Sequence, residues 1–133
     1  MPIPPEILAM DVGSGTQDIL IFQEGKPVEN CPQLVLPSPT SIIAQRIMRA
    51  TKRKETLYLT GNLMGGGPSA WAVDGHLRSG LKVYASPAAA LTFSDDLERV
   101  RAMGIRVTGR SPRGAKEIRL GDVDLPALGK ALR

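Results

Sequence analysis

Three short apolar runs occupy the first 37 residues of the chain. They cover residues 6–10 (EILAM), 18–23 (DILIFQ) and 31–36 (CPQLVL), and short turn-like segments separate them. Runs of this length between turn residues are typical of β-strands, and short connections join antiparallel neighbours. The pattern therefore predicts three antiparallel strands at the start of the chain.

A longer pattern with the period of a helix follows these runs. Ser38 is a favourable N-cap, and Pro39 stands where a helix tolerates proline best. Apolar and basic residues then separate onto two faces, with Ile43, Ile47 and Ala50 on one and Arg46, Arg49 and Arg53 largely on the other. The segment predicts an amphipathic helix of about four turns.

Helices and strands alternate through the rest of the sequence. The predicted strands cover residues 56–60, 81–85, 105–108 and a short segment near 117–120. The predicted helices cover residues 69–77, 87–93, 94–103 and 125–132. Three antiparallel strands followed by this alternation indicate an α/β fold with one mixed sheet flanked by helices. We expect residues 1–108 to form the α/β core and residues 109–133 to form a basic loop, a short strand and a C-terminal helix.

Composition narrows the class of protein. The chain has 133 residues, of which 42% are hydrophobic, and this length suits one domain with a real core. No apolar stretch is long enough to span a membrane, and the first residues lack the features of a secretory signal. The single cysteine, Cys31, excludes a disulfide within the chain. These features favour a cytoplasmic protein that does not enter a membrane.

The positive charge is concentrated near the end of the sequence. Residues 106–133 hold seven basic and three acidic residues, so they account for the whole net charge of +4. Such a segment can bind nucleic acid, but residues 108–117 (TGRSPRGAKE) contain no aromatic residue for stacking on bases. A solvated loop is the favoured interpretation, and nucleic-acid binding is a weaker alternative.

The first candidate site is the segment DVGSGT. Asp11 ends the first predicted strand, and Gly13, Ser14, Gly15 and Thr16 form the turn after it. Glycines let phosphate groups approach backbone N–H groups, the hydroxyl groups add donors, and a nearby carboxylate can hold hydrated Mg²⁺. A tight hairpin that needs glycine for positive φ explains the same residues. The spacing alone leaves both interpretations open.

A second glycine-rich loop follows the strand over residues 56–60. Gly65, Gly66 and Gly67 stand in a row before Pro68, which suits the first turn of a helix. Three consecutive glycines raise the entropy lost on folding, so a ligand-facing loop is favoured over a plain turn. If the strand at 56–60 lies parallel beside the first strand, both glycine loops open onto one crevice.

Other candidate residues have structural explanations. We expect His76 to lie on the surface or at a helix end, because no metal-binding residues stand at suitable spacing. Trp71 is expected in the core. Asp95 and Asp96 follow the expected cap Ser94, so they are interpreted as charges that stabilise a helix N-terminus. Neither a P-loop motif nor a G-x-G-x-x-G motif leading into a helix is present.

Residues 7–22, ILAMDVGSGTQDILIF, resemble the first phosphate motif of the actin, sugar-kinase and heat-shock ATPase superfamily. The resemblance implies a ribonuclease-H-like sheet, with Asp11 facing Mg²⁺-bound phosphates and the turn from Gly13 to Thr16 facing the phosphate groups. Gln17 and Asp18 depart from the pattern, because superfamily members often have a basic or polar phosphate contact here. A second carboxylate near phosphate is unfavourable unless it faces away.

The superfamily resemblance also implies a longer protein. Its second phosphate loop and its adenosine-binding motif lie in a second lobe, for which 133 residues leave no room. We therefore expect the chain to be the first lobe of an actin-like ATPase fold, with the second lobe of the full-length chain as its partner. An exposed apolar surface at the expected lobe contact would allow homo-oligomers.

A narrower resemblance covers nearly the whole chain, from about residue 7 to residue 132. The segments MGGGPSAW and DDLERVRAMGI are similar to an uncharacterised microbial family whose members are sometimes labelled pyruvate formate-lyase activating enzymes. Such an enzyme holds an iron–sulfur cluster with three closely spaced cysteines. Cys31 stands alone, so we expect no iron–sulfur cluster and reject that reaction for this chain.

Together these features predict binding of ATP, or another phosphorylated small molecule, with Mg²⁺ in a cleft between two lobes. The chemistry would be phosphoryl transfer or hydrolysis by positioning and electrostatics, and the sequence does not indicate the acceptor. The alternative is a non-catalytic ligand-binding or assembly domain that keeps the fold without ATPase activity.

Overall fold

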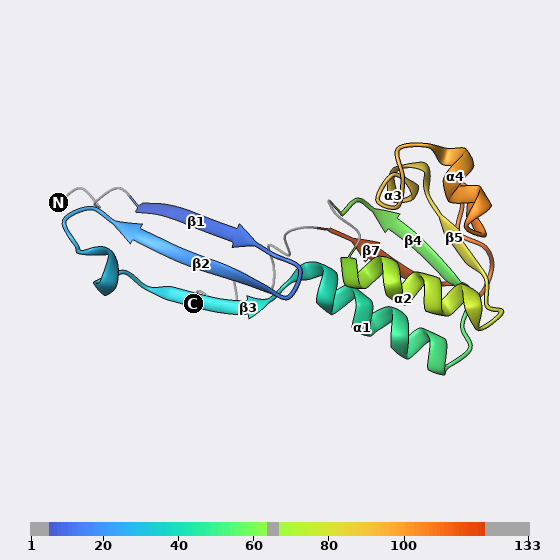
Figure 1. Ribbon diagram of the computed structural model, residues 1–133, viewed down its shortest axis with the longest axis horizontal. Helices are drawn as coiled ribbons and strands as arrows, with labels where there is room; N and C mark the ends of the chain where they lie inside the picture. Colours follow the sequence, from blue (N-terminus) through green and yellow to red (C-terminus); the bar gives the residue numbers. More distant parts are fainter. Residues whose placement is uncertain (1–5, 64–66, 122–133) are drawn as a thin grey trace. The chain divides into compact units, whose positions relative to one another are not determined.

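Two separately packed units make up the chain, residues 1–38 and residues 39–133. The computed structural model describes residues 6–63 and 67–121 (Figure 1). Among these described residues, no helix combines the length and the apolar composition needed to cross a bilayer. Each unit has its own sheet.

The first unit is an antiparallel sheet of three strands. Strands β1 (Glu6–Val12), β2 (Thr16–Gln23) and β3 (Gln33–Pro37) pair in the order β1-β2-β3 (Figure 1). A short 3-10 helix, η1 (Val28–Asn30), precedes β3. All three predicted strands are confirmed, and β1 and β2 extend up to the glycine turn that joins them.

Apolar side chains are exposed on both faces of this sheet. The register places Ile7 and Val35 on one face, where they are 60% and 67% exposed. Leu8 and Val12 lie on the opposite face and are also exposed. Exposed apolar surface of this kind is typical of a face that contacts a partner. The expected pairing with another lobe or with a second copy of the chain stays a prediction.

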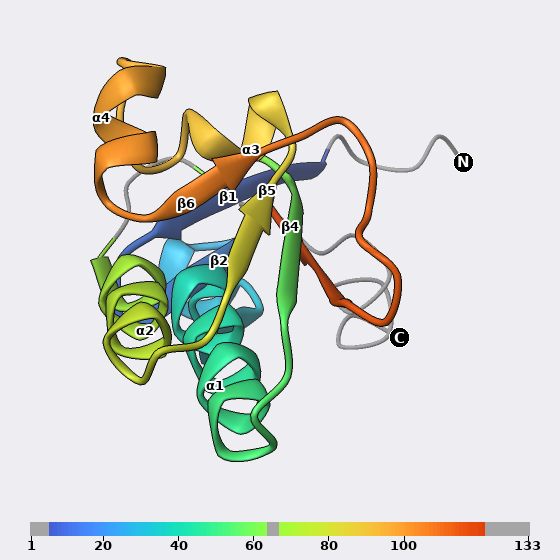
Figure 2. The same ribbon diagram turned by 90° about the vertical axis from the view of Figure 1, so that its right-hand side faces the viewer.

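The second unit combines helices with a parallel sheet. Its sheet has the order β6-β5-β4-β7, and α1 and α2 lie side by side against it (Figure 2). The helices are α1 (Pro39–Lys52), α2 (Gly67–Arg78), α3 (Pro87–Ala90) and α4 (Leu97–Ala102). The strands are β4 (Leu57–Gly61), β5 (Val83–Ala85), β6 (Ile105–Val107) and β7 (Lys116–Leu120). The predicted helix at 125–132 lies outside the described residues.

The core of this unit lies between its helices and the sheet. The predicted apolar face of α1 is confirmed, because Ile43, Ile47 and Ala50 are all buried in one cluster. Leu57 and Leu59 of β4 are fully buried in the same cluster. Apolar burial of this kind is the main force that holds a helix layer to a sheet.

The prediction of one mixed sheet is wrong. The two neighbours of β4 are β5 and β7: Leu59 pairs with Ala85 on one side and with Ile118 on the other. A strand has only two edges for hydrogen bonding, so β4 has none left for β1. The antiparallel and the parallel strands therefore form two sheets, and the expected parallel pair of the first strand and the strand at 56–60 is not formed.

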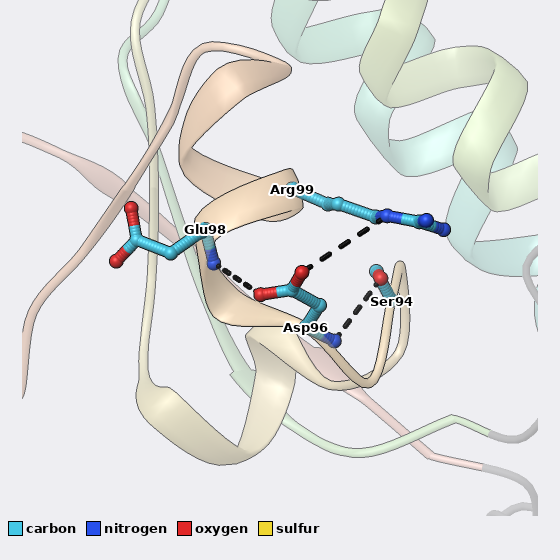
Figure 3. A network of polar contacts seen from close by, with 4 residues as sticks. All are labelled: Ser94, Asp96, Glu98 and Arg99. Atoms are coloured by element: carbon cyan, nitrogen blue, oxygen red, sulfur yellow. Dashed lines mark hydrogen bonds and ion pairs between the residues drawn. The ribbon is translucent and has the colours of Figure 1, made fainter.

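Short capping motifs begin the helices α3 and α4. Ser86 caps α3 as predicted: its side chain accepts a hydrogen bond from the N–H of Ala89 at 3.2 Å. The cap of α4 is Asp96, not Ser94, and its carboxylate accepts from the N–H of Glu98 at 3.0 Å (Figure 3). Ser94 instead accepts from the N–H of Asp96. The cap therefore stands two residues later than the sequence suggested, and Asp96 stabilises the N-terminus of α4 as this cap.

Candidate functional site

The turn between β1 and β2 is fixed by Ser38. Its N–H donates to the carbonyl of Gly15 at 3.0 Å, and its hydroxyl donates to the carbonyl of Ser14 at 2.8 Å. The N–H of Gly13 donates to the carbonyl of Thr16 at 3.0 Å, which closes the hairpin. The buried Ser38 thus holds two successive carbonyl groups of an otherwise exposed turn.

These contacts decide where the N–H groups of the turn point. In a planar trans peptide the C=O and the N–H point in opposite directions. The carbonyls of Ser14 and Gly15 both point toward Ser38, so the N–H groups of Gly15 and Thr16 both point away from it. Neighbouring N–H groups with a common direction form an anion-binding concavity.

The glycines of this turn are not explained by positive φ. Neither Gly13 nor Gly15 lies in the left-handed region, so the hairpin exists without the conformation that the simpler interpretation required. A Cβ atom at Gly13 would lie 3.1 Å from the carbonyl oxygen of Thr16, which accounts for that glycine. A Cβ atom at Gly15 would meet nothing within 4 Å, so within the described residues the chain itself does not require this glycine.

Two carboxylates face each other beside the turn. The register pairs Asp11 of β1 directly with Asp18 of β2, so both side chains lie on one face of the sheet with Thr16. Directly opposed Cβ atoms lie about 5 Å apart, and like charges there are destabilising. Within the described residues neither carboxylate forms an ion pair. The sequence prediction treated Asp18 only as a departure, whereas the register makes it the neighbour of Asp11.

The described residues contain no group of three or more His, Cys, Asp or Glu side chains that could hold a metal ion. Asp11 and Asp18 are only two ligands. Mg²⁺ commonly keeps several waters and binds one or two carboxylates together with phosphate oxygens. The pair thus suits a cation that arrives with a phosphate ligand better than a metal held by protein alone.

The second glycine loop is described only in part. Gly65 and Gly66 lie outside the described residues, and Gly67 begins α2 with a φ of +39°. Near the start of this helix, the N–H of Ser69 donates to the side chain of Thr40 at 3.1 Å. This loop and the turn after Asp11 follow strands of different sheets, so a crevice at the edge of one common sheet is not formed.

Two single residues on α2 lie in places opposite to those expected. His76 is completely buried, while Trp71 is 75% exposed. The buried residues of α2 are Ser69, Val73 and His76, spaced four and three apart along one stripe of the helix. Trp71 is two residues from both Ser69 and Val73, so it lies on the opposite side of the helix and points away from the core.

Among the residues that the structure describes, the imidazole of His76 has one hydrogen-bonding partner, Thr51. The hydroxyl of Thr51 donates to the carbonyl of Ile47 at 2.9 Å and lies 2.8 Å from Nδ1 of His76. Since that hydroxyl has one proton, Nδ1 is assigned as the donor to Thr51. Nε2 is buried without a hydrogen bond among the described residues.

Burial of His76 should make folding sensitive to pH. Desolvation lowers the pKa of His76 below its ordinary value of 6.5, and the main chain of Glu55 and Lys82 and the charge of Glu55 act in the opposite direction. The unfolded chain then binds the proton more tightly than the folded chain, so the free energy of unfolding falls as the pH falls through 6.5. Because one proton is involved, the slope just below pH 6.5 should not exceed about 1.4 kcal/mol per pH unit. Urea unfolding at several pH values measures it, and an equal slope in His76→Gln would contradict this origin.

One comparison with known proteins identifies a family. Residues 64–133, more than half of the chain, match the model of the family described as "Putative pyruvate format-lyase activating enzyme (DUF1786)". Neither the curated proteins nor the solved structures yielded a match. The chain therefore belongs to the family with this description.

Proposed function

We propose that the chain binds a phosphorylated ligand, with ATP and Mg²⁺ as the favoured pair, as the first lobe of a two-lobed protein of the actin-like ATPase or kinase type. The observation that carries the proposal is the hairpin after Asp11. Asp11 and Asp18 lie opposite each other, next to a turn in which the N–H groups of Gly15 and Thr16 point away from Ser38. The proposal does not depend on Gly65, Gly66 and Gly67, although Gly67 begins a helix whose N-terminus favours anions.

Charge explains why two carboxylates and a phosphate can share this place. Two opposed carboxylates repel each other by about 1 kcal/mol in water, and a divalent cation between them removes this repulsion. The same cation offsets the repulsion between the carboxylates and a phosphate group. The N–H groups of Gly15 and Thr16 and the hydroxyl groups of the turn then bind phosphate oxygens directly.

The reaction we propose is phosphoryl transfer or hydrolysis in a cleft completed by a second lobe. Positioning and neutralisation of charge are the main tasks in such reactions, and the hairpin supplies groups for both. The family description names a different activity, which requires a cluster held by several cysteines. Among these 133 residues Cys31 is the one cysteine, so they do not by themselves supply such a ligand set.

Calorimetric titration of MgATP into the full-length protein, with its proposed second lobe, tests this proposal; the first lobe alone should bind nucleotide weakly or not at all. We expect wild type to bind ATP in the presence of Mg²⁺ and to bind ATP more weakly when EDTA removes the cation. Asp11→Asn and Asp18→Asn should each weaken binding by about tenfold or more, because each removes one charged ligand of the cation. Glu24→Gln is the matched control, since Glu24 is an exposed carboxylate in the same unit but away from the turn.

A second variant tests the approach of the ligand to the backbone. Gly15→Val should leave the hairpin folded, because space is free around Gly15 and its φ is not positive. The same side chain should block contact between phosphate and the N–H groups and abolish the Mg²⁺-dependent part of the binding. Absence of binding in folded wild type would overturn the proposal and favour the non-catalytic domain. Equal binding by wild type and the aspartate variants would also overturn it.

A further inference from the structure

The second unit has a basic pocket that the proposed function does not use. It is open, has a volume of about 310 Å³, and lies between α1 and β7, both labelled in Figure 1. Its basic residues come from two distant parts of the sequence: Arg46, Arg49, Arg53, Lys116 and Arg119. The fold brings these two segments together.

The charges of the pocket are poorly compensated. Glu55 and Glu117 are its acidic residues, so five basic and two acidic side chains leave a formal charge of +3. Arg53 lies 4.0 Å from Glu55, at the outer limit of an ion pair, and Glu117 accepts a hydrogen bond from Thr60 at 3.3 Å. In the described part of the chain, the other four basic residues form no ion pair. Clustered cations in a concave site attract anions.

The spacing of the arginines indicates the shape of the anion. Arg46 and Arg49 of α1 and Arg53, which directly follows the helix, stand three and four residues apart and line one side of the pocket over about 10 Å. Guanidinium groups bind phosphate oxygens in pairs. Lys116 and Arg119 of β7 also line the pocket, with Lys116 on the strand face of Ile118 and Arg119 on the opposite face. The buried Ala50 and Ile118 complete the lining between α1 and β7.

We propose that this pocket binds a small polyanion with two or more linked phosphate groups. A row of guanidinium groups can contact successive phosphates, whereas a single phosphate would leave part of the row unused. The pocket lining contains no aromatic side chain, so it offers no platform for stacking the bases of a single strand. The pocket has a limited volume and is bounded by α1 on one side and β7 on the other. These limits favour a compact ligand over a long nucleic acid.

Titration of inorganic tripolyphosphate into the full chain in EDTA tests the pocket without the Mg²⁺-dependent hairpin. We expect binding that weakens as salt is raised, and Arg49→Gln should weaken it by about tenfold because Arg49 is central in the row. Arg78→Gln is the matched control: it removes the same charge from α2, where Arg78 pairs with Asp74 outside the pocket. Circular dichroism verifies that both variants are folded. Asp11→Asn should bind tripolyphosphate as wild type does, which separates this pocket from the hairpin.

Three further titrations distinguish the sources of phosphate. ATP in EDTA should compete with tripolyphosphate, while orthophosphate should bind at least tenfold more weakly. An oligonucleotide without a terminal phosphate should also bind more weakly, and tighter binding by it would replace this proposal with a nucleic-acid surface. No binding of tripolyphosphate by wild type, or equal weakening in Arg49→Gln and Arg78→Gln, would overturn the assignment.

Discussion

Replacing Gly61 with alanine is expected to lower the free energy of unfolding by about 3 kcal/mol or more. Gly61 ends β4 with a φ of +74°, a conformation that alanine adopts only with strain. A Cβ atom here would also come closer to the carbonyl oxygen of Leu120 than real Cβ atoms do. This oxygen belongs to the backbone of β7, so it can give way only if the paired strands shift. Urea unfolding followed by circular dichroism measures the loss.

Gly80→Ala separates the two causes. Gly80 has a similar φ of +82°, but a Cβ atom there meets nothing within 4 Å. We therefore expect this variant to lose only about 1–2 kcal/mol through backbone strain. Equal losses in the two variants would show that the contact with Leu120 has no part in the need for Gly61.

Leu59→Ala should lower the free energy of unfolding by about 2–5 kcal/mol. Leu59 is completely buried in β4, between β5 and β7 in the middle of the parallel sheet. Its truncation removes apolar contacts and leaves a cavity that paired strands on both sides cannot easily close. A shift of the urea midpoint with an unchanged slope is the expected observation.

Leu91→Ala is the control for this effect. It is the same substitution, but Leu91 follows α3 and is 46% exposed. Its loss should stay below about 1 kcal/mol, because much of its apolar surface is already in water. If both variants lose the same stability, burial in β4 does not account for the role of Leu59.

Within the described residues, local pattern was sufficient to predict most of the individual helices and strands. The stripe of Ile43, Ile47 and Ala50 in α1 is buried as its spacing requires, and Ser86 caps α3 through its side chain. Such features depend on neighbours within a few residues, which the sequence displays directly. Pairing of strands depends instead on residues far apart. Nothing near Leu59 indicates that Ile118 will be its partner in the sheet.

The positions of His76 and Trp71 show a second limit. Residue type suggested that tryptophan would be buried and histidine exposed, yet the stripe of α2 that faces the core includes position 76 and omits position 71. Position on the helix therefore outweighed side-chain hydrophobicity. The unexpected burial was accommodated because Thr51 of α1 supplies a hydrogen bond to the imidazole.

The candidate site was predicted in composition but not in geometry. The glycine turn and Asp11 were recognisable from the order of residues in the sequence. That Asp18 lies opposite Asp11 became clear only from the register of β1 and β2. Counting outward from the turn, with Gly13 opposite Thr16, would have revealed this pair, since antiparallel register follows from the length of the turn. The contacts of Ser38 with the turn were not foreseeable, because 24 residues separate it from Ser14.

The pairing of β4 with β7 also sets an order in which the second unit can assemble. Leu57 lies opposite Lys116, so closing this part of the sheet requires a loop of about sixty residues. While the ribosome makes the chain, α1, β4, α2 and β5 are complete well before β7 emerges. Until then the N–H and C=O groups along one edge of β4 are unpaired, and such an edge can pair with another chain and cause aggregation.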